Sequence, residues 1–169
     1  MREIRILNAN DAEDFWPLRL EALQLEPEWF GTTYDEVVNE SWDKVRERLQ
    51  PGVDGMVVGA YESGLVGIVG IYIIRRRRLM HKGVIWGLYV TPRARGRNIG
   101  SQLLGELERQ AIIAYPNLQQ LTLSVVTTNL AARNLYRKLG YKPWGIEPGS
   151  LFWDDGLFDE EHLTKPLVR

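Results

Sequence analysis

A group of basic and glycine residues between positions 93 and 100 has the composition of an anion-binding site. Arg93, Arg95 and Arg97 alternate with small residues, and Gly96 and Gly100 stand on either side of the last arginine. Arginine supplies a permanent positive charge with several N–H donors, and glycines let a phosphate approach the backbone. The pattern predicts a phosphate or pyrophosphate ligand. The same residues also fit a simple turn with a solvated basic rim, and both interpretations stay open on these residues alone.

Other known phosphate-binding loops fit this segment less well. The chain has no G-x-G-x-x-G sequence, and Gly100 is followed by Ser101 where a P-loop would have its lysine. A nicotinamide or nucleoside-triphosphate fold is therefore not expected.

A second group of residues with chemical potential lies between positions 129 and 141. Asn129 is a candidate helix N-cap, Gly140 suits the left-handed residue that ends a helix, and Tyr136 supplies a hydroxyl between them. In a Schellman helix ending Tyr141 would contact a residue near Tyr136. Both tyrosines therefore also have a purely structural explanation.

The elements that position these two groups follow from the spacing of apolar residues. The run from Val84 to Val90 predicts a strand buried on both faces. Apolar residues at helical spacing predict a helix from Ile99 to about Tyr115, and Leu121 to Val126 predict the next strand. A crossover of this length predicts that the two strands are parallel. The first N–H groups of the helix would then face the anion.

The remaining segments predict further strands and helices around this centre. Four arginines from Arg75 to Arg78 are interpreted as a charged hairpin tip. The expected elements are an opening strand at 2–8, a helix at 10–25 capped by Asn10 or Asp11, a loop at 27–33, a helix from about Asp35 or Ser41 to Leu49, a hairpin of 56–61 and 65–74, and a closing hairpin of 150–153 and 161–167.

The two groups resemble the two signatures of the GCN5-related N-acetyltransferase (GNAT) superfamily. The segment 95–100, RGRNIG, resembles its R/Q-x-x-G-x-G/A motif, with Asn98 where the family more often has glycine. Asparagine tolerates left-handed backbone conformations, so this departure is mild. The segment 129–141 resembles N-x-x-A-x-x-L-Y-x-x-x-G-F/Y, one strand downstream as in the family. The resemblance spans essentially the whole chain and implies one domain over residues 1–169. Its implied fold is α/β (α+β), with a mixed, mostly antiparallel sheet, a splayed parallel central strand pair and flanking helices.

The resemblance implies acetyl-CoA as the donor and a primary amine, on a small molecule or a protein, as the acceptor. Tyr136 would donate a proton to the departing thiolate, since a tyrosine with a usual pKa near 10 can protonate a thiolate whose usual pKa is about 8.5. The implied donor-binding residues are Leu88, Tyr89 and Val90 for the pantetheine arm, the backbone of Arg95, Gly96, Arg97, Asn98, Ile99, Gly100 and Ser101 for the pyrophosphate, and Asn129 and Ala132, with Tyr136, on the other side.

The acceptor side of the reaction is poorly defined by the sequence. No carboxylate lies between His81 and Pro92, where relatives often have a glutamate as the base. A Ser-His-Asp hydrolase is not expected, because the chain has only His81 and His162, and His162 falls in a predicted terminal strand. Aromatic residues in the first loop could touch the acceptor or could equally fix the loop to the sheet. These aromatics are Trp29, Phe30 and Tyr34, and the scattered candidate bases, none of them favoured, are Glu28, Asp35, Glu36, His81 and Glu147.

Composition excludes several classes of protein. The 169 residues carry a net charge of −1, so no basic field would recruit nucleic acid or a membrane surface. The absence of cysteine rules out disulfides, thiolate metal sites and an acyl-cysteine route, which leaves direct transfer in a ternary complex. No metal is expected. Without a signal peptide or an apolar span, a cytoplasmic protein is expected. The resemblance also implies that a homodimer is possible, since many relatives form one.

The sequence leaves three functions to compare. The leading one is an acetyl-CoA-dependent N-acetyltransferase. The missing strand carboxylate keeps open a coenzyme A-binding module without efficient transfer, and a purely structural domain is the third.

Overall fold

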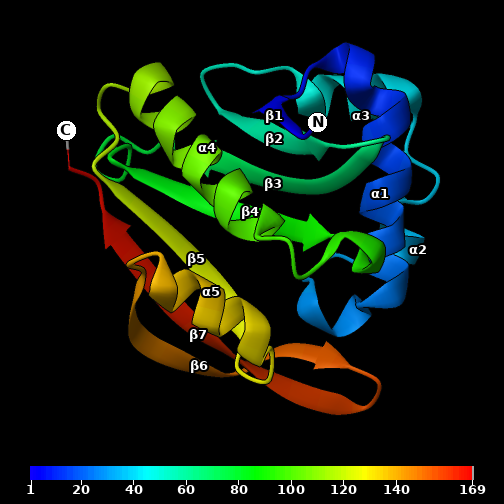
Figure 1. The fold of residues 1–169 in the computed structure, drawn as a ribbon. Coiled ribbons are helices and arrows are strands. Elements are labelled where there is room, and N and C mark those ends of the chain that lie inside the picture. Colours follow the sequence, from blue (N-terminus) through cyan, green and yellow to red (C-terminus); the bar gives the residue numbers. More distant parts are fainter. Residues whose placement is uncertain (169) are drawn as a thin grey trace.

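The protein is built on one twisted seven-stranded sheet, seen here in a computed structural model that describes residues 1–168 (Figure 1). The spatial order is β1-β2-β3-β4-β5-β7-β6, and all neighbours are antiparallel except β4 and β5, which are parallel. The predicted fold class and the predicted parallel pair are therefore confirmed. The strands are β1 (Glu3–Ile6), β2 (Gly55–Tyr61), β3 (Leu65–Ile73), β4 (Lys82–Val90), β5 (Gln120–Val126), β6 (Lys142–Trp153) and β7 (Gly156–Pro166).

Helices cover both faces of the sheet, so the sheet has a hydrophobic core on each side. On one face α4 packs through Leu103, Leu104 and Leu107. On the other face α1 packs through residues such as Phe15 and Ala22. Figure 1 shows α4 and α5 in front of the sheet and α1 to α3 beside and behind it. The helices are α1 (Ala12–Leu25), α2 (Tyr34–Val37), α3 (Trp42–Leu49), α4 (Ile99–Ala114) and α5 (Leu130–Lys138), with the 3-10 turns η1 (Ala9–Asp11), η2 (Pro27–Trp29) and η3 (Pro92–Ala94).

The N-terminal helices begin differently from the prediction. Asp11 stands at the N-cap position of α1 as predicted, but its side chain makes no capping hydrogen bond to that helix. The side-chain cap is made one turn earlier by Asn8, which accepts a hydrogen bond from the N–H of Asn10, because a 3-10 turn is inserted before α1. The predicted second helix is two helices. Thr33 begins α2 in a reciprocal capping box, and Ser41 caps α3, so both of the predicted starting points are used.

The central strand is less buried than its apolar sequence predicted. Ile85 and Tyr89 are buried, but Trp86 and Leu88 are only partly so. The prediction of burial on both faces is therefore wrong for β4. Its physical reason is that the sheet opens beside this strand.

Candidate active site

The parallel strands β4 and β5 are joined over only three residue pairs. Pairing runs from Lys82 opposite Gln120 to Val84 opposite Thr122 and then stops. Beyond that point β4 stays paired with β3 and β5 stays paired with β7. Because each strand keeps its outer partner while losing its inner one, the two strands diverge, as Figure 1 shows. The result is a V-shaped opening in the middle of the sheet.

A β-bulge in β4 accounts for this divergence. Tyr89 pairs with Ile68 and Trp86 pairs with Gly70, so two residues of β4 lie opposite one of β3. One of these two is Gly87, whose φ of 66° is in the left-handed region that glycine adopts at low cost. A bulge bends its strand and increases the local twist. The bulge therefore turns β4 away from β5 just after their last shared pair.

The loop after β4 forms one wall of the opening and leads into α4. Gly96 has a φ of 76° and Asn98 a φ of 61°, so asparagine does adopt the left-handed conformation proposed for it. The Asn98 side chain makes no capping hydrogen bond. The N–H groups of the first turn of α4 therefore have no side-chain cap, which leaves them open to an anion.

The two arginines of the first signature lie in different places. Arg95 lines the opening, where its Nη1 lies 2.7 Å from Oε1 of Glu26 and its Nε donates to the carbonyl of Val90. Arg97 instead points to Glu62 on the β2–β3 hairpin, with 2.9 Å between Nη1 and Oε2. The structure therefore does not bring the Arg97 side chain to the opening, although its backbone belongs to the loop.

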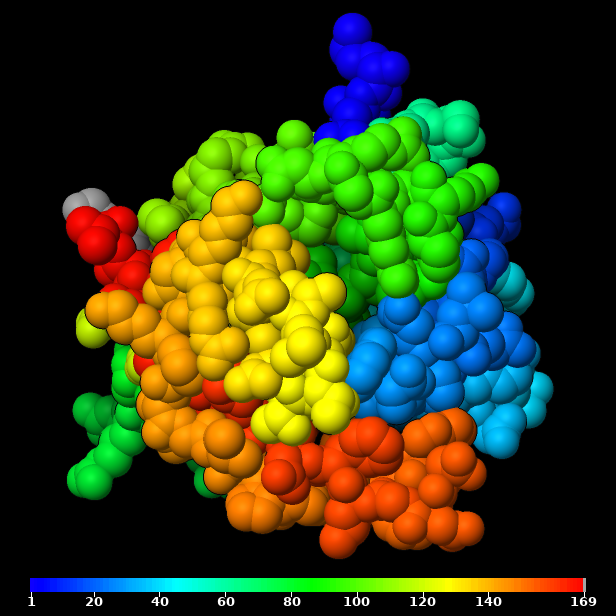
Figure 2. Space-filling model, turned by 60° about the horizontal axis from the view of Figure 1, so that its bottom comes forward, coloured from blue at the N-terminus to red at the C-terminus, as the bar shows by residue number. Residues whose placement is uncertain are grey.

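The start of α5 forms the opposite wall. The Oδ1 of Asn129 accepts a hydrogen bond from the N–H of Ala132, as expected of an N-cap. Together the two walls enclose a cleft of about 640 Å³. Figure 2 shows this hollow between the green loop before α4, the yellow start of α5 and the blue segment around η2. The lining residues are Glu26, Trp29, Leu88, Tyr89, Val90, Ala94, Arg95, Gly96, Asn98, Ile99, Gly100, Ser101, Thr128, Asn129, Leu130, Ala131, Ala132, Leu135 and Lys138.

Tyr136 comes directly after a residue of this cleft wall in the sequence, but it is buried and does not line the cleft. Its neighbour Leu135 lines the cleft, whereas Tyr136 is 7% exposed and packs edge to face on Tyr141 with 5.7 Å between ring centroids. Its hydroxyl has no hydrogen-bond partner within residues 1–168. The hydroxyl oxygen is not fully enclosed, because the only fully enclosed unpaired side-chain atom in these residues is Nη1 of Arg19. Burial raises the pKa of Tyr136, so the hydroxyl stays protonated at neutral pH.

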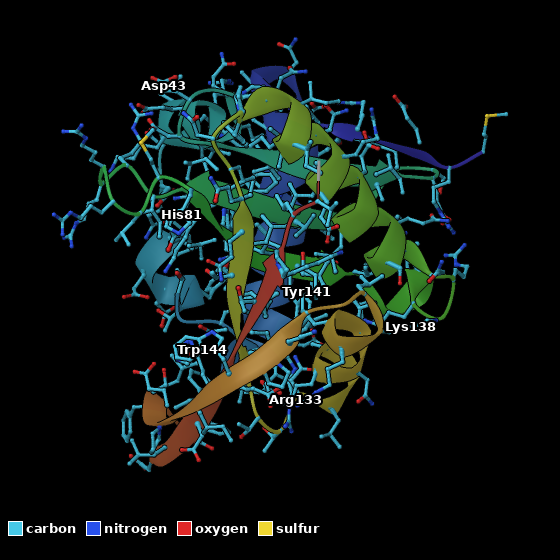
Figure 3. The ribbon with its side chains drawn as sticks, turned by 90° about the vertical axis from the view of Figure 1, so that its left-hand side faces the viewer. Asp43, His81, Arg133, Lys138, Tyr141 and Trp144 are labelled. Atoms are coloured by element: carbon cyan, nitrogen blue, oxygen red, sulfur yellow. The ribbon has the colours of Figure 1, made fainter. Side chains whose placement is uncertain are left out.

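Tyr141 has the structural role that the helix ending predicted. Gly140 has a φ of 89°, and the N–H of Tyr141 donates to the carbonyl of Tyr136. The Tyr141 hydroxyl donates to Oε1 of Glu108 on α4 over 2.7 Å. Figure 3 labels Tyr141 beside α5. It therefore ties the end of α5 to α4.

A second cleft, of about 800 Å³, lies on the face covered by α1 to α3. Trp29 lines both clefts, so η2 forms part of the wall of each. Phe30 also lines the second cleft, but Tyr34 does not. The lining residues are Arg19, Trp29, Phe30, Gly31, Thr32, Glu36, Val37, Glu40, Arg48, Tyr72, Val84, Ile85, Trp86, Gly87, Ser124, Leu151 and Glu160.

Five residues, four carboxylates and one histidine, were candidate bases from the sequence, and of these only Glu36 lines the second cleft. Its carboxylate accepts hydrogen bonds from the N–H and the hydroxyl of Thr33, and the backbone bond is the main reason why its pKa is lowered. A carboxylate held in this way is a weak base. Glu28, Asp35, His81 and Glu147 line neither cleft.

A hydrogen-bonded chain that the sequence did not predict reaches the second cleft from the C-terminal strands. Oγ of Ser124 lies 2.9 Å from Nδ1 of His162, and Nε2 of His162 lies 2.9 Å from Oε2 of Glu147. The imidazole also stacks on Trp144. In Figure 3 Trp144 lies on the side of the β6–β7 hairpin that faces away from α5. The terminal-strand position of His162 therefore does not isolate it, because β7 pairs with β5 opposite Ser124.

The described residues contain neither a metal-binding cluster nor a membrane-spanning helix. Residues 1–168 hold no group of three or more histidine, aspartate, glutamate or cysteine side chains that could bind a metal ion. Within the same residues, no helix is long and apolar enough to cross a membrane.

The fold matches those of solved acetyltransferase structures. A structure of a GNAT-family acetyltransferase from Streptococcus pneumoniae superposes with a TM-score of 0.87 at 22% identity, covering 99% of this chain and 100% of that one. A ribosomal-protein-alanine N-acetyltransferase from Brucella melitensis gives 0.78 at 22% identity, covering 98% and 99%. A candidate acetyltransferase from Salmonella typhimurium, solved with its cofactor acetyl-CoA, gives 0.79 at 17% identity, covering 100% and 95%.

One of the two sequence comparisons identifies a family. A search of curated proteins finds no match. The model of the Acetyltransferase (GNAT) family matches residues 17–141, which include both signature segments, the splayed strands and most of the two clefts. The chain therefore belongs to the GNAT acetyltransferase family.

Proposed function

We propose that this protein is an acetyl-CoA-dependent N-acetyltransferase that passes the acetyl group directly to a primary amine in a ternary complex. The observation that carries the proposal is the divergence of β4 and β5 beyond Val84, with a cleft that has an open helix N-terminus in its wall and a second cleft on the face of α1 to α3, Trp29 lining both. A donor and an acceptor can approach each other there from opposite sides of the sheet.

The residues of the first cleft fit coenzyme A. The backbone from Arg95 to Ser101 would hold the pyrophosphate, and the unpaired edge of β4 from Leu88 to Val90 would hydrogen-bond the pantetheine arm as a neighbouring strand would. Asn129 and Ala132 would enclose the arm from α5. Bound there, acetyl-CoA would supply the activated acetyl group as a thioester.

Side chains from α5 and from the C-terminal strands would handle the protons. Tyr136 does not itself line the first cleft but follows the lining residue Leu135 on α5, and its protonated hydroxyl would give a proton to the departing thiolate. Ser124 faces the acceptor cleft and would take a proton from the acceptor ammonium while passing its own to Nδ1 of His162. Glu147 would stabilise the imidazolium, with Nε2 as donor. The neutral amine can then attack the acetyl carbon.

Calorimetric titration of acetyl-CoA tests the donor site. Wild type should bind, and Gly100→Glu should not, because it places a like charge at the proposed pyrophosphate site and a Cβ 3.1 Å from Leu135. Gly105→Glu is the matched control, since the same change later in α4 meets nothing within 4 Å. Equal binding by the two variants, or no binding by wild type, would contradict the proposal.

A coenzyme A-binding module is the alternative class, motivated by the lack of a carboxylate on β4. Release of free thiol in the presence of a broad panel of amines separates the two functions. Turnover of one amine excludes the module, whereas tight donor binding without turnover of any amine favours it.

A further inference from the structure

Arg19 is a buried charged residue whose guanidinium is incompletely compensated within residues 1–168. It lies on the buried face of α1, is only 8% exposed, and its Nη1 is the one fully enclosed side-chain nitrogen or oxygen in these residues that lacks a hydrogen-bond partner. Burying a cation without a partner is costly, and proteins normally pair or neutralise such a group. An unpaired guanidinium on the wall of a cleft therefore points to a partner that comes from outside the chain.

The residues around Arg19 do not supply that partner. The rings of Phe30 and Trp86 lie 5.1 and 5.7 Å from the guanidinium carbon, which offsets part of the cost through cation–π contact. Burial, and secondarily the like charge of Arg48, lower the pKa of Arg19 to about 10. The guanidinium is therefore still charged at neutral pH.

The carboxylates of the second cleft are already engaged elsewhere. Both oxygens of Glu40 accept from Arg48 over 2.9 Å, Glu36 caps α2, and Glu160 accepts from the Ser150 hydroxyl. No ion pair joins Arg19 to any of them in the described chain. The guanidinium of Arg19 therefore has no anionic partner among the carboxylates that line this cleft.

Arg19 lies close to the part of β4 where the proposed reaction would take place. A Cβ on Gly87 would lie 3.5 Å from Nη1 of Arg19, so the guanidinium reaches β4 at its bulge, where the strands begin to diverge. Gly87 and Ser124 line the same cleft. An anion on Arg19 would therefore be held beside the point where the acceptor amine must arrive.

We propose that the acceptor is a small amino acid or related amine that carries a carboxylate, and that Arg19 binds this carboxylate. The proposal rests on the proposed acetyltransferase function and narrows its acceptor class. Polyamines would be disfavoured because they bring further positive charge toward Arg19 and Arg48. A peptide N-terminus would lack the free carboxylate next to its amine.

The test uses matched acceptors: amino acids, each beside its primary amide and its decarboxylated amine. With acetyl-CoA, wild type should have a kcat/KM for the acid roughly 10- to 100-fold above that for the amide, as expected for a buried charge-assisted hydrogen bond. Arg19→Met, which keeps the side-chain volume, should lose this preference because its kcat/KM for the acid falls while its kcat/KM for the amide stays unchanged. Arg46→Met on exposed α3 is the control and should keep it.

A stability measurement separates binding from folding. Arg19→Met should melt a few degrees above wild type, because replacing a buried unpaired charge with an apolar side chain is stabilising. A lower melting temperature would mean that the guanidinium supports the fold, and would overturn the assignment. Arg19→Lys, which keeps the charge without the planar fork, should give an intermediate preference for the acid.

The outcomes distinguish this proposal from the one on which it rests. If amides and decarboxylated amines are acetylated as well as the acids, the Arg19 assignment fails and the acetyltransferase function stands. If no amine is acetylated, the acetyltransferase function fails. Calorimetry of the amino acids with coenzyme A-bound protein then decides the binding site: binding lost in Arg19→Met supports it, and binding unchanged in Arg19→Met, or absent in wild type, overturns it.

Discussion

Tyr136 and Tyr141 lie five residues apart in one helix ending, yet their hydroxyl groups are in different situations. Tyr136 has no hydrogen-bond partner in the described chain, whereas Tyr141 donates to Glu108, which also pairs with Lys165. A hydroxyl without a partner contributes little to stability. Variants of the two tyrosines can therefore separate the proposed catalytic role of Tyr136 from the structural role of Tyr141.

Removing the Tyr136 hydroxyl should slow the reaction without weakening the protein. Tyr136→Phe is expected to lower kcat on the order of 100-fold, as for loss of a general acid, while the free energy of unfolding stays within about 0.5 kcal/mol. Tyr141→Phe should do the reverse, costing about 1–3 kcal/mol because a buried hydrogen bond is lost. Steady-state kinetics and urea unfolding measure both. Unchanged kcat in Tyr136→Phe would remove it from the acid role.

The relay through His162 predicts a change in pH dependence. His162→Phe keeps the stack on Trp144 but has no ring nitrogens, so the acceptor must lose its proton to solvent. The rate of the variant should then rise about tenfold per pH unit up to the pKa of the acceptor amine, while wild type keeps its rate at neutral pH. His81→Phe, in the β3–β4 loop, should behave as wild type. Parallel pH profiles for the wild type and His162→Phe would exclude the relay.

At the scale of the elements, an ion pair holds β1 to the entry of α1. Asp11 accepts from Arg5 over 2.7 and 2.9 Å, and also from the N–H of Asn8 and the hydroxyl of Tyr61. These bonds, with that from Arg5 the largest contribution, lower the pKa of Asp11 from 3.8 to about 2. Because the pKa is lower in the folded state, the charged carboxylate favours folding.

The sign of this shift fixes its pH window. The stabilisation is nearly complete above the unfolded pKa near 4 and is lost progressively as the pH falls through the folded pKa near 2. Asp11→Asn should therefore cost roughly 2 kcal/mol at pH 7 and only a small part of that near pH 2, where the folded carboxyl is half protonated. Urea unfolding followed by tryptophan fluorescence across this range measures it, with the exposed Asp43→Asn as control. A difference at pH 2 as large as that at pH 7 would contradict the assignment.

The elements predicted best are those defined by neighbouring residues. Gly96 and the apolar spacing after Ile99 located the loop and α4, and Asn129 to Tyr141 located α5 with its cap and its ending. The bulge at Gly87 was missed, although a lone glycine inside a strand was its signal. Patterns of neighbouring residues therefore predict those elements whose hydrogen bonds and caps also join neighbouring residues.

The acceptor side could not be predicted because it is assembled across long sequence separations. Ser124 and His162 are 38 residues apart and meet only through the register of β5 and β7. Arg19 carried a weak signal, as a charged residue on the apolar face of its helix, but that its Nη1 lacks a partner depends on where Phe30 and Trp86 pack. Such features follow from the tertiary structure.

At the scale of the whole molecule, the sheet is two half-sheets joined by three residue pairs. A ligand that fills the opening should bind both halves and stabilise the fold. Acetyl-CoA at 100 times its Kd should contribute about 2.7 kcal/mol, or a rise in Tm of roughly 5–10 °C. Amide exchange should slow most at residues 85–90 and in the following loop. A rise in Tm without added protection on β4 would contradict strand-like binding.

The same three-residue junction gives the protein two open strand edges inside its own sheet. Beyond Val84 and Thr122, β4 and β5 present backbone groups to the opening without a strand partner, and such edges pair readily with any extended chain. β1 and β6 form the ordinary outer edges. A molecule that has not yet met its ligand therefore has four places at which another copy can add a strand. If acetyl-CoA fills the opening as proposed, its supply and the resistance of the protein to aggregation would be coupled.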